Sequence, residues 1–415
     1  MTPEQQYHLD NEHKYAGFGT RLNQQVVEQV AQGLTQLDLR SQDVHGMDRM
    51  FYKVSSRIGD TQAFYNGFEA IIIKNMPANF KVDGLDLKDL EIRLSAPPQP
   101  FHGKNDPAGQ FEKVLEEYQV GVKADMAKLY HQNKDLFYKV AFAYKEVLEP
   151  LIKADRKAEV DQGIAALMGN DIRKQWFPAD QGITRVEAFN LLDEIDHQRA
   201  VYKTYRVHEK KGGEEAATAP VQSPEGESAT KEARKTYGVW LLLDYVDVEA
   251  NHPEGKLQNP TKHGNRLLER IDDNYGFDIR AVLPRFGWKG TDSDKVIDDL
   301  AKALEKGNKV EVAPIDQSKY ETVFIYANPR AKTITIEDHE GNRLPHAMFL
   351  TEAARQERSE KHQNQPFNGH AFRVANRPTQ KAAGAGEEGE AHEKKNSNPH
   401  ARIVQDGKGK GHGVS

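Results

Sequence analysis

Residues 34–75 read LTQLDLRSQDVHGMDRMFYKVSSRIGDTQAFYNGFEAIIIKN and contain three segments with the character of β-strands. The first, LTQLDLRS, alternates through Leu37 and Leu39, MFYKVSS is aromatic and β-branched, and QAFYNGFEAIIIKN ends in a β-branched run. Both kinds of pattern favour strands. Because glycines or acidic residues separate the segments, this stretch predicts a β-meander.

The flanking residues give the limits of this first unit. Upstream, Leu22, Val26 and Val30 fall four apart on one stripe, as in a short helix. Residues 1–76 are therefore predicted as an N-terminal helix plus β-meander. Downstream, residues 77–107 carry five prolines, which helix interiors and central strands exclude, so they predict a Pro-rich connector.

From residue 108 the apolar residues change to a helical period. Residues 108–182 are predicted as a helical insertion, because one set of apolar residues shares a helix face and a second set begins at Phe137. The first set is Phe111, Leu115, Tyr118, Val122 and Leu129.

Residues 183–350 predict a C-terminal α+β domain. Thr184 and Glu187 have the spacing of a capping box, and TYGVWLLLDYVDV, from residue 236, predicts a buried strand. KVEVAPI, YETVFIYAN and KTITIED predict three closing strands. Residues 209–234 contain no aromatic residue and predict a mobile loop.

The remaining residues, 351–415, are polar and predict a disordered tail. The fold class expected from these blocks is α+β. It consists of small mixed β-sheet units with packed helices, the helical insertion and the disordered C-terminal tail.

Composition limits the classes of function. The chain has 415 residues, no cysteine and a net charge of −6, so disulfide frameworks, thiolate metal sites and Cys nucleophiles are excluded. The first thirty residues lack the basic and apolar regions of a secretory signal. No apolar stretch approaches the roughly 20 residues that cross a bilayer. We therefore expect a cytoplasmic location and no membrane partner.

Motifs for catalysis or cofactor binding are incomplete. KYAGFG and KGTDSDK complete neither GxxxxGK[ST] nor GxGxxG, and neither HExxH nor GxSxG occurs. Acidic doublets such as Asp193-Glu194 are expected on solvated helix faces. The sequence therefore predicts no cofactor and no metal site, and it identifies no catalytic residue.

Two loop segments look like motifs and are the candidate binding residues. The first is KYAGFG, with Tyr15, Gly17, Phe18 and Gly19, and the second is ANPRAK, with Asn328, Pro329, Arg330 and Lys332. Turn formation is the alternative explanation for both segments. Trp176 and Trp288 border loops and are candidate exposed anchors for a protein partner.

The tail offers a possible contact with nucleic acid. Residues 352–415 carry eleven basic and eight acidic side chains, so the tail has a net charge of +3. Its end concentrates the basic residues against the single acid Asp406, as an electrostatic arm would. A solvating tail without a ligand is the alternative. The basic residues are Lys394, Lys395, Arg402, Lys408 and Lys410.

Several stretches together resemble a known group of proteins. They are KYAGFG and AFYNGFEAII near the N-terminus, then ITRVEAFNLLDEIDHQRAV, YGVWLLLDY, NYGFDIRAVLPRF, LAKALEKGNKVEV and VFIYANPRAKTITIEDHEGNRL. Their patterns are similar to the KY-GFG, EA-NLL-RAV, W-LDF, NYG-D and ANP-KT patterns of an uncharacterised Bacteroidetes family often found near mobile genetic elements. The resemblance implies a bacterial, cytoplasmic protein and assigns no catalytic residue.

Three functional hypotheses follow. The preferred one is a non-enzymatic interaction or accessory protein with an unidentified protein partner. The second is a nucleic-acid-associated protein that works through its tail, and the third is an enzyme with an unrecognised site. An enzyme would bring polar side chains of the KYAGFG and ANPRAK segments together in a deep pocket.

Overall fold

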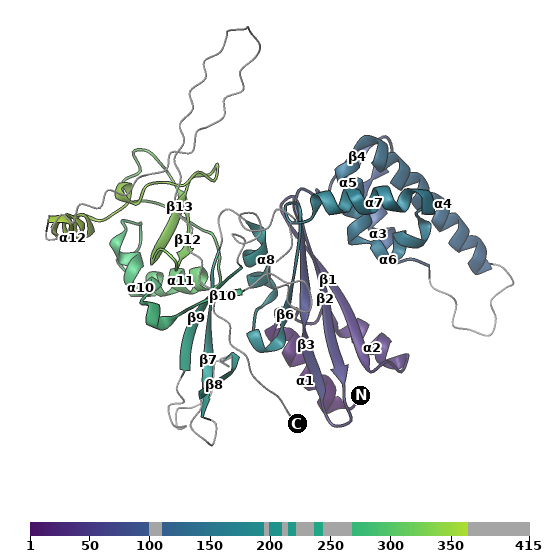
Figure 1. The fold of residues 1–415 in the computed structure, drawn as a ribbon, viewed down its shortest axis with the longest axis horizontal. Helices are drawn as coiled ribbons and strands as arrows, with labels where there is room; N and C mark the ends of the chain where they lie inside the picture. The colour runs from purple at the N-terminus through teal and green to yellow at the C-terminus, as the bar shows by residue number, and fades with distance from the viewer. Residues whose placement is uncertain (99–109, 195–198, 210–214, 221–235, 244–267, 364–415) are drawn as a thin grey trace, which may run out of the picture. The chain divides into compact units, whose positions relative to one another are not determined.

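A computed structural model describes residues 1–98, 110–194, 199–209, 215–220, 236–243 and 268–363. These ranges hold 11 α-helices and four antiparallel sheets, which confirms the α+β class (Figure 1). Residues 1–362 form one compact unit. No helix within the described ranges is both long and apolar enough to cross a membrane.

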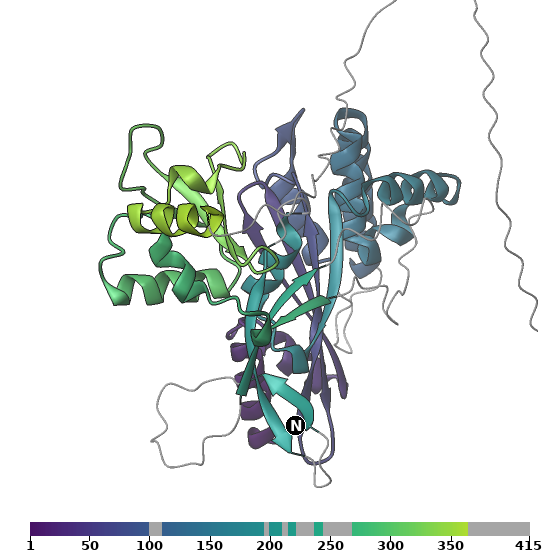
Figure 2. The ribbon, with the colours of Figure 1, turned by 60° about the vertical axis from the view of Figure 1, so that its left-hand side comes forward.

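The first sheet contains the predicted meander and one further strand. Its order is β1-β2-β3-β6, and its long strands run side by side in Figures 1 and 2. The prediction of a helical insertion reaching residue 182 is therefore wrong at its end, because residues 172–178 pair with β3. The strands are β1 (Gln36–His45), β2 (Asp48–Ile58), β3 (Ala63–Ile73) and β6 (Ile172–Pro178).

Both faces of the first sheet are buried, which explains the continuous apolar run in β3. Ala70 and Ile72 belong to a first core, whereas Ile71 and Ile73 belong to a second. Successive strand residues point to opposite faces, so a strand covered on both sides needs apolar residues at every position.

Three helices contribute to the first core. Thr2 and Thr184 each form a capping box, at the starts of α1 and α8, and the second of these was predicted. Leu9, Val26 and Leu191 bring one apolar residue of each helix into the core. The helices are α1 (Pro3–Tyr15), α2 (Asn23–Ala31) and α8 (Arg185–Asp193).

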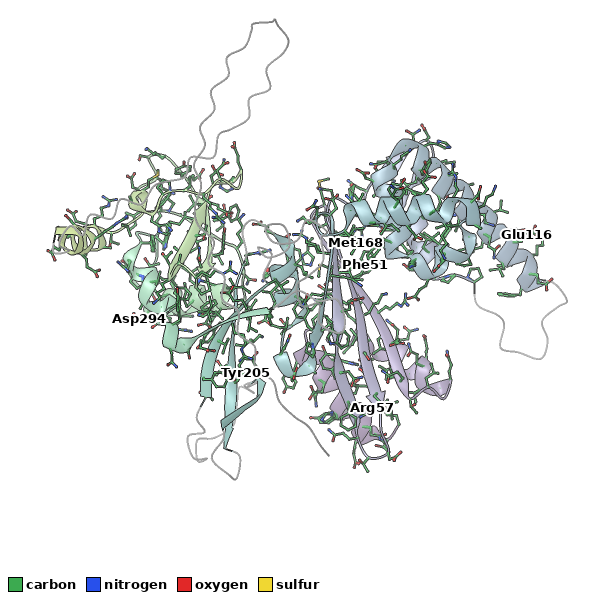
Figure 3. All side chains as sticks on the ribbon, in the orientation of Figure 1. Phe51, Arg57, Glu116, Met168, Tyr205 and Asp294 are labelled. Carbon is green, nitrogen blue, oxygen red and sulfur yellow. The ribbon has the colours of Figure 1, made fainter. Side chains whose placement is uncertain are left out.

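The second core lies among the helices of the insertion. Phe51 and Met168 pack against it where the first sheet meets these helices (Figure 3). The prediction of a connector at residues 77–107 is wrong in part, because a short hairpin and helix α3 occupy residues 81–95. Asp86 caps this helix by accepting a hydrogen bond from Lys88 N. Residues 99–109 lie outside the described ranges. The elements are β4 (Lys81–Val82), β5 (Leu85–Asp86), α3 (Leu87–Ser95), α4 (Gln110–Gln132), α5 (Lys134–Ala143), α6 (Lys145–Leu148) and α7 (Ala154–Leu167).

The second sheet, of order β10-β9-β7-β8, also has two buried faces. Val239 and Leu241 of β9 join the first core, while Trp240 and Leu242 join a third. The predicted mobile loop at 209–234 contains a strand at residues 215–220, because this segment pairs with β7; its other residues, apart from Glu209, lie outside the described ranges. The strands are β7 (Val201–Glu209), β8 (Glu215–Pro220), β9 (Thr236–Leu243) and β10 (Leu268–Asp272).

The third core contains the predicted closing strands and Trp288. The prediction of Trp288 as an exposed anchor is wrong, because its ring is 1% exposed and stacks on Phe286 at 5.9 Å. Trp176 is half-buried on β6. The elements are α10 (Ile279–Val282), α11 (Asp294–Glu305), β11 (Val310–Val312), β12 (Val323–Asn328) and β13 (Thr333–Glu337).

The body extends beyond the predicted start of the tail at residue 351. Helix α12 (Glu352–Gln363) follows because Thr351 is bound to the body through Arg285 O, at 3.0 Å, and caps the helix through Ala354 N. The tail prediction for residues 364–415 lies outside the described ranges.

Candidate functional site

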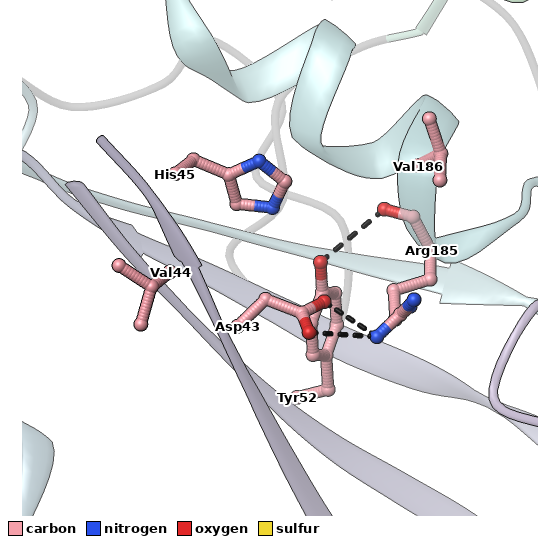
Figure 4. A pocket seen from close by; sticks show the side chains of 6 residues that line it. All are labelled: Asp43, Val44, His45, Tyr52, Arg185 and Val186. Carbon is pink, nitrogen blue, oxygen red and sulfur yellow. Dashed lines mark hydrogen bonds and ion pairs between the residues drawn. The ribbon is translucent and has the colours of Figure 1, made fainter.

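A small hollow lies between the end of β1 and the start of α8. Its volume is about 120 Å³. Figure 4 shows its six lining residues, which combine charged, aromatic and aliphatic side chains. They are Asp43, Val44, His45, Tyr52, Arg185 and Val186.

Two arginines neutralise the carboxylate in this hollow. Arg185 approaches both oxygens of Asp43, at 2.8 and 2.6 Å, and Arg21 donates to one of them at 2.7 Å. Side-chain exposure is 16% for Asp43, 15% for Arg185 and 51% for Arg21. The group therefore carries one surplus positive charge, and its accessible part is the Arg21 guanidinium.

The imidazole and the phenol of the hollow are both held uncharged at neutral pH. Burial lowers the pKa of His45, whose ring stacks on Phe189 at 3.9 Å. Burial also raises the pKa of Tyr52, whose hydroxyl donates to Arg185 O at 3.3 Å. His45 Nε2 is shielded from solvent, faces Tyr52 in Figure 4 and has no hydrogen-bond partner within the described part of the chain.

The outer edge of β1 beside the hollow is only partly covered. Gln25 of α2 exchanges two hydrogen bonds with the backbone of Arg40, both at 2.8 Å. Gln29 does the same with Asp38, at 2.8 and 3.1 Å. Backbone groups of alternate residues point to the same side of a strand, so Gln42 and Val44 also point outward. No described residue bonds to their outward N–H and C=O groups.

Two residues of the KYAGFG segment contact residues that line the hollow. Ala16 O accepts a hydrogen bond from Arg185 N at 2.9 Å, and a Cβ added to Gly17, at φ +88°, would lie 3.5 Å from the Cβ of Arg185. Phe18 is 1% exposed and its ring packs edge-on against Tyr52 at 5.5 Å. Tyr15 is exposed, and Gly19, at φ +59°, has open space around it. Of the predicted residues, Gly17 and Phe18 therefore lie beside lining residues of the hollow, whereas Tyr15 and Gly19 do not, and none of the four lines it.

The ANPRAK segment forms the turn between β12 and β13. Asn328 Oδ1 accepts from Ala331 N at 3.1 Å, and the buried Pro329 accepts from Lys332 N at 3.1 Å. Lys332 lies over the ring of Tyr275 at 4.2 Å, and Arg330 donates to Glu269 at 2.8 Å. The contacts of Asn328 and Pro329 are those of a turn, whereas Lys332 and Arg330 join the turn to Tyr275 and to Glu269 of β10.

The EAFNLLD and KGN segments meet at Asn190. Its Nδ2 donates to Lys306 O at 2.7 Å and to Asn308 Oδ1 at 2.8 Å, while its Oδ1 accepts from Arg199 at 3.0 Å. A Cβ on Gly307 would lie 3.1 Å from Ala200 O. These motif-like residues therefore join α8 and β7 to the α11–β11 turn, and their contacts are structural.

The hollow is smaller than a typical ligand pocket. Ligand pockets for drug-sized molecules usually measure about 300–1,000 Å³, so about 120 Å³ admits little more than one side chain. Over the described ranges, no three His, Asp or Glu side chains gather as metal ligands. The basic tail residues Lys394, Lys395, Arg402, Lys408 and Lys410 lie outside these ranges.

Sequence reasoning missed Asp43, His45 and Arg185. Asp43 and His45 precede a two-residue hairpin turn, and Arg185 is the first residue of α8, so each looks like ordinary turn or cap chemistry. Comparisons with protein-family models, with curated proteins and with solved structures gave no match.

Proposed function

We propose that this chain is a non-enzymatic interaction or accessory protein that binds a protein partner at the open edge of β1. The observation that carries the proposal is the incomplete cover of that edge, where Gln42 and Val44 keep outward backbone groups unpaired within the described chain. Unpaired strand edges pair with extended segments of other chains, and many proteins cover them for that reason.

The surface around the edge supports a protein partner. Val44 is 52% exposed and Val186, at the start of α8, is 45% exposed. Both are among the residues that line the hollow, together with the ion pair of Arg185 and Asp43. The Val44 side chain points away from the hollow in Figure 4, so the open edge has an exposed apolar side chain on the sheet face opposite to Asp43. Exposed apolar side chains beside charged ones are common at protein interfaces.

Site-specific photo-cross-linking tests this proposal. A photoreactive amino acid replaces Val44 or Val186 in the full chain, and Val296 or Ile315, which are 42% and 64% exposed elsewhere, in matched controls. After nuclease treatment of the native cytosol, we expect the first two positions to give one common cross-linked protein that the controls do not give. Equal yields from all four positions would contradict the proposal.

The cellular setting is part of the proposal. The resemblance to the Bacteroidetes family supports a cytoplasmic role beside a mobile genetic element. Binding of nucleic acid through the basic end of the tail is the alternative outcome. In that case Val44 and Val186 would give no common cross-linked protein after nuclease treatment, and nucleic acid bound before that treatment would be lost on replacement of the basic tail residues.

A further inference from the structure

The side chains that cover the outer edge of β1 differ along the strand: two are amides and the third is a guanidinium. Gln29, Gln25 and Arg21 are spaced four apart, and they contact Asp38, Arg40 and Asp43 in turn. The two amides reproduce the hydrogen bonds of a neighbouring strand. Arg21 instead binds a side chain, so the backbone beside it stays open.

Arg21 is the accessible donor at this place. A guanidinium has five N–H donors, and Arg21 uses Nη1 on Asp43. Its other nitrogens have no partner within the described residues, and half of its side chain is exposed. Because Asp43 is already bound by Arg185 as well, the local charge remains positive.

An added strand would place one of its side chains beside this donor. A residue opposite Asp43 shares its sheet face, because directly opposed side chains in adjacent strands point to the same side. That face carries Arg21, Arg185 and the hollow. The neighbouring positions would pair with the backbone of Gln42 and Val44.

We infer that the partner segment is an extended, acidic peptide that pairs with Gln42 and Val44 and places an Asp or Glu carboxylate opposite Asp43, against Arg21. This inference rests on the proposed function and specifies the chemistry of the partner. A guanidinium and a carboxylate form a strong, charge-assisted pair. A second copy of this chain fits poorly, since a two-fold contact would bring Arg21 against the positive group of its mate.

The test is a selection from a displayed library of random twelve-residue peptides on the full-length protein. We expect enriched peptides with Asp or Glu at one fixed position between β-branched residues. Their affinity should fall about tenfold with Arg21→Gln, which removes about 1.4 kcal/mol of binding. Lys53→Gln removes the same charge from the neighbouring strand β2 and should change the affinity less than twofold.

Val44→Pro tests pairing at the β1 edge separately from the preference for an acidic peptide. The substitution deletes one outward N–H at a strand edge, where proline is tolerated. Peptides that require Val44 but show no acidic preference would overturn the acidic inference alone. Peptides that bind Val44→Pro as well as the natural chain would overturn both the inference and the proposed edge. Dimerisation of the full chain that Val44→Pro abolishes would show that a second copy is the occupant, and would also overturn the inference.

Discussion

The amide group of Gln25 pairs with both backbone groups of Arg40, with the two hydrogen bonds each 2.8 Å long. A primary amide presents N–H donors and a carbonyl acceptor side by side, so one side chain can bond to both the C=O and the N–H of a strand residue. The side chain therefore takes the place of a neighbouring strand at one position of β1. Gln29 repeats the arrangement at Asp38, one turn further along α2.

Removing both amides should open the whole outer edge of β1. For Gln25→Ala with Gln29→Ala we expect a loss of about 1–2 kcal/mol in the free energy of unfolding, because four solvent-exposed hydrogen bonds disappear. We also expect concentration-dependent self-association, measured by sedimentation. Gln24→Ala, whose hydrogen-bond partner within the described ranges is the Glu28 side chain, is the control. A variant as stable and monomeric as the control would contradict the role of the two amides.

Gly67 should be the least replaceable glycine of the first sheet. Its φ is +130°, and an added Cβ would lie 2.3 Å from Phe177 O, so Gly67→Ala must separate β3 from β6. We expect a loss of about 3 kcal/mol or more in chemical denaturation. Gly33→Ala, also at positive φ but in open space, should lose only about 1 kcal/mol. Equal losses would refute the steric explanation.

Stability should fall in acid because of His13. Its side chain is 0% exposed, shares a hydrogen bond with Ser56 at 3.0 Å, and burial lowers its pKa from 6.5 to about 4. The unfolded state therefore binds the proton first, so this contribution is complete above pH 6.5 and is lost towards pH 4. The loss amounts to about 3 kcal/mol.

Unfolding free energies measured across this pH range check the prediction. His13→Gln should flatten the decline with falling pH, whatever its effect on the free energy of unfolding at neutral pH. An identical slope in His13→Gln would show that other groups cause the acid sensitivity.

Asn190 should hold α8 to the turn between α11 and β11. Asn190→Asp removes the donor to Lys306 O and Asn308 Oδ1 and places a negative charge against both oxygens. We expect a loss of about 2–4 kcal/mol in urea denaturation, because Asn190 is 3% exposed. Asn274→Asp, on the surface, is the control. If both variants had the same free energy of unfolding as the natural chain, the contacts of Asn190 would not stabilise the fold.

Local patterns predicted the α+β class, the meander and the second capping box. They did not predict a strand at residues 172–178, because IRKQWFP is too short and too polar to be recognised as a strand unless its pairing with β3 is known. Helix α3 was hidden by the prolines around it. Helix α12 was hidden by its polar composition, since its order depends on Thr351 and the buried Ala354.

The candidate site was less predictable than the fold. KYAGFG was selected as a candidate because of its glycines. In the structure, Ala16 and Phe18 of this segment contact Arg185 and Tyr52, which line the hollow. Asp43 and Arg185 are 142 residues apart in the chain, and no local pattern predicts their contact. The open edge depends on what α2 leaves uncovered, which is a property of tertiary structure.

The most direct test of the central claim is affinity purification from nuclease-treated native cytosol with three full-length chains. They are the natural sequence, Val44→Pro, and a tail variant with Lys394, Lys395, Arg402, Lys408 and Lys410 replaced by Gln. We predict that the protein cross-linked at Val44 and Val186 is recovered with the natural chain and the tail variant but lost with Val44→Pro. Its recovery with Val44→Pro, or its loss with the tail variant, would contradict binding at the β1 edge.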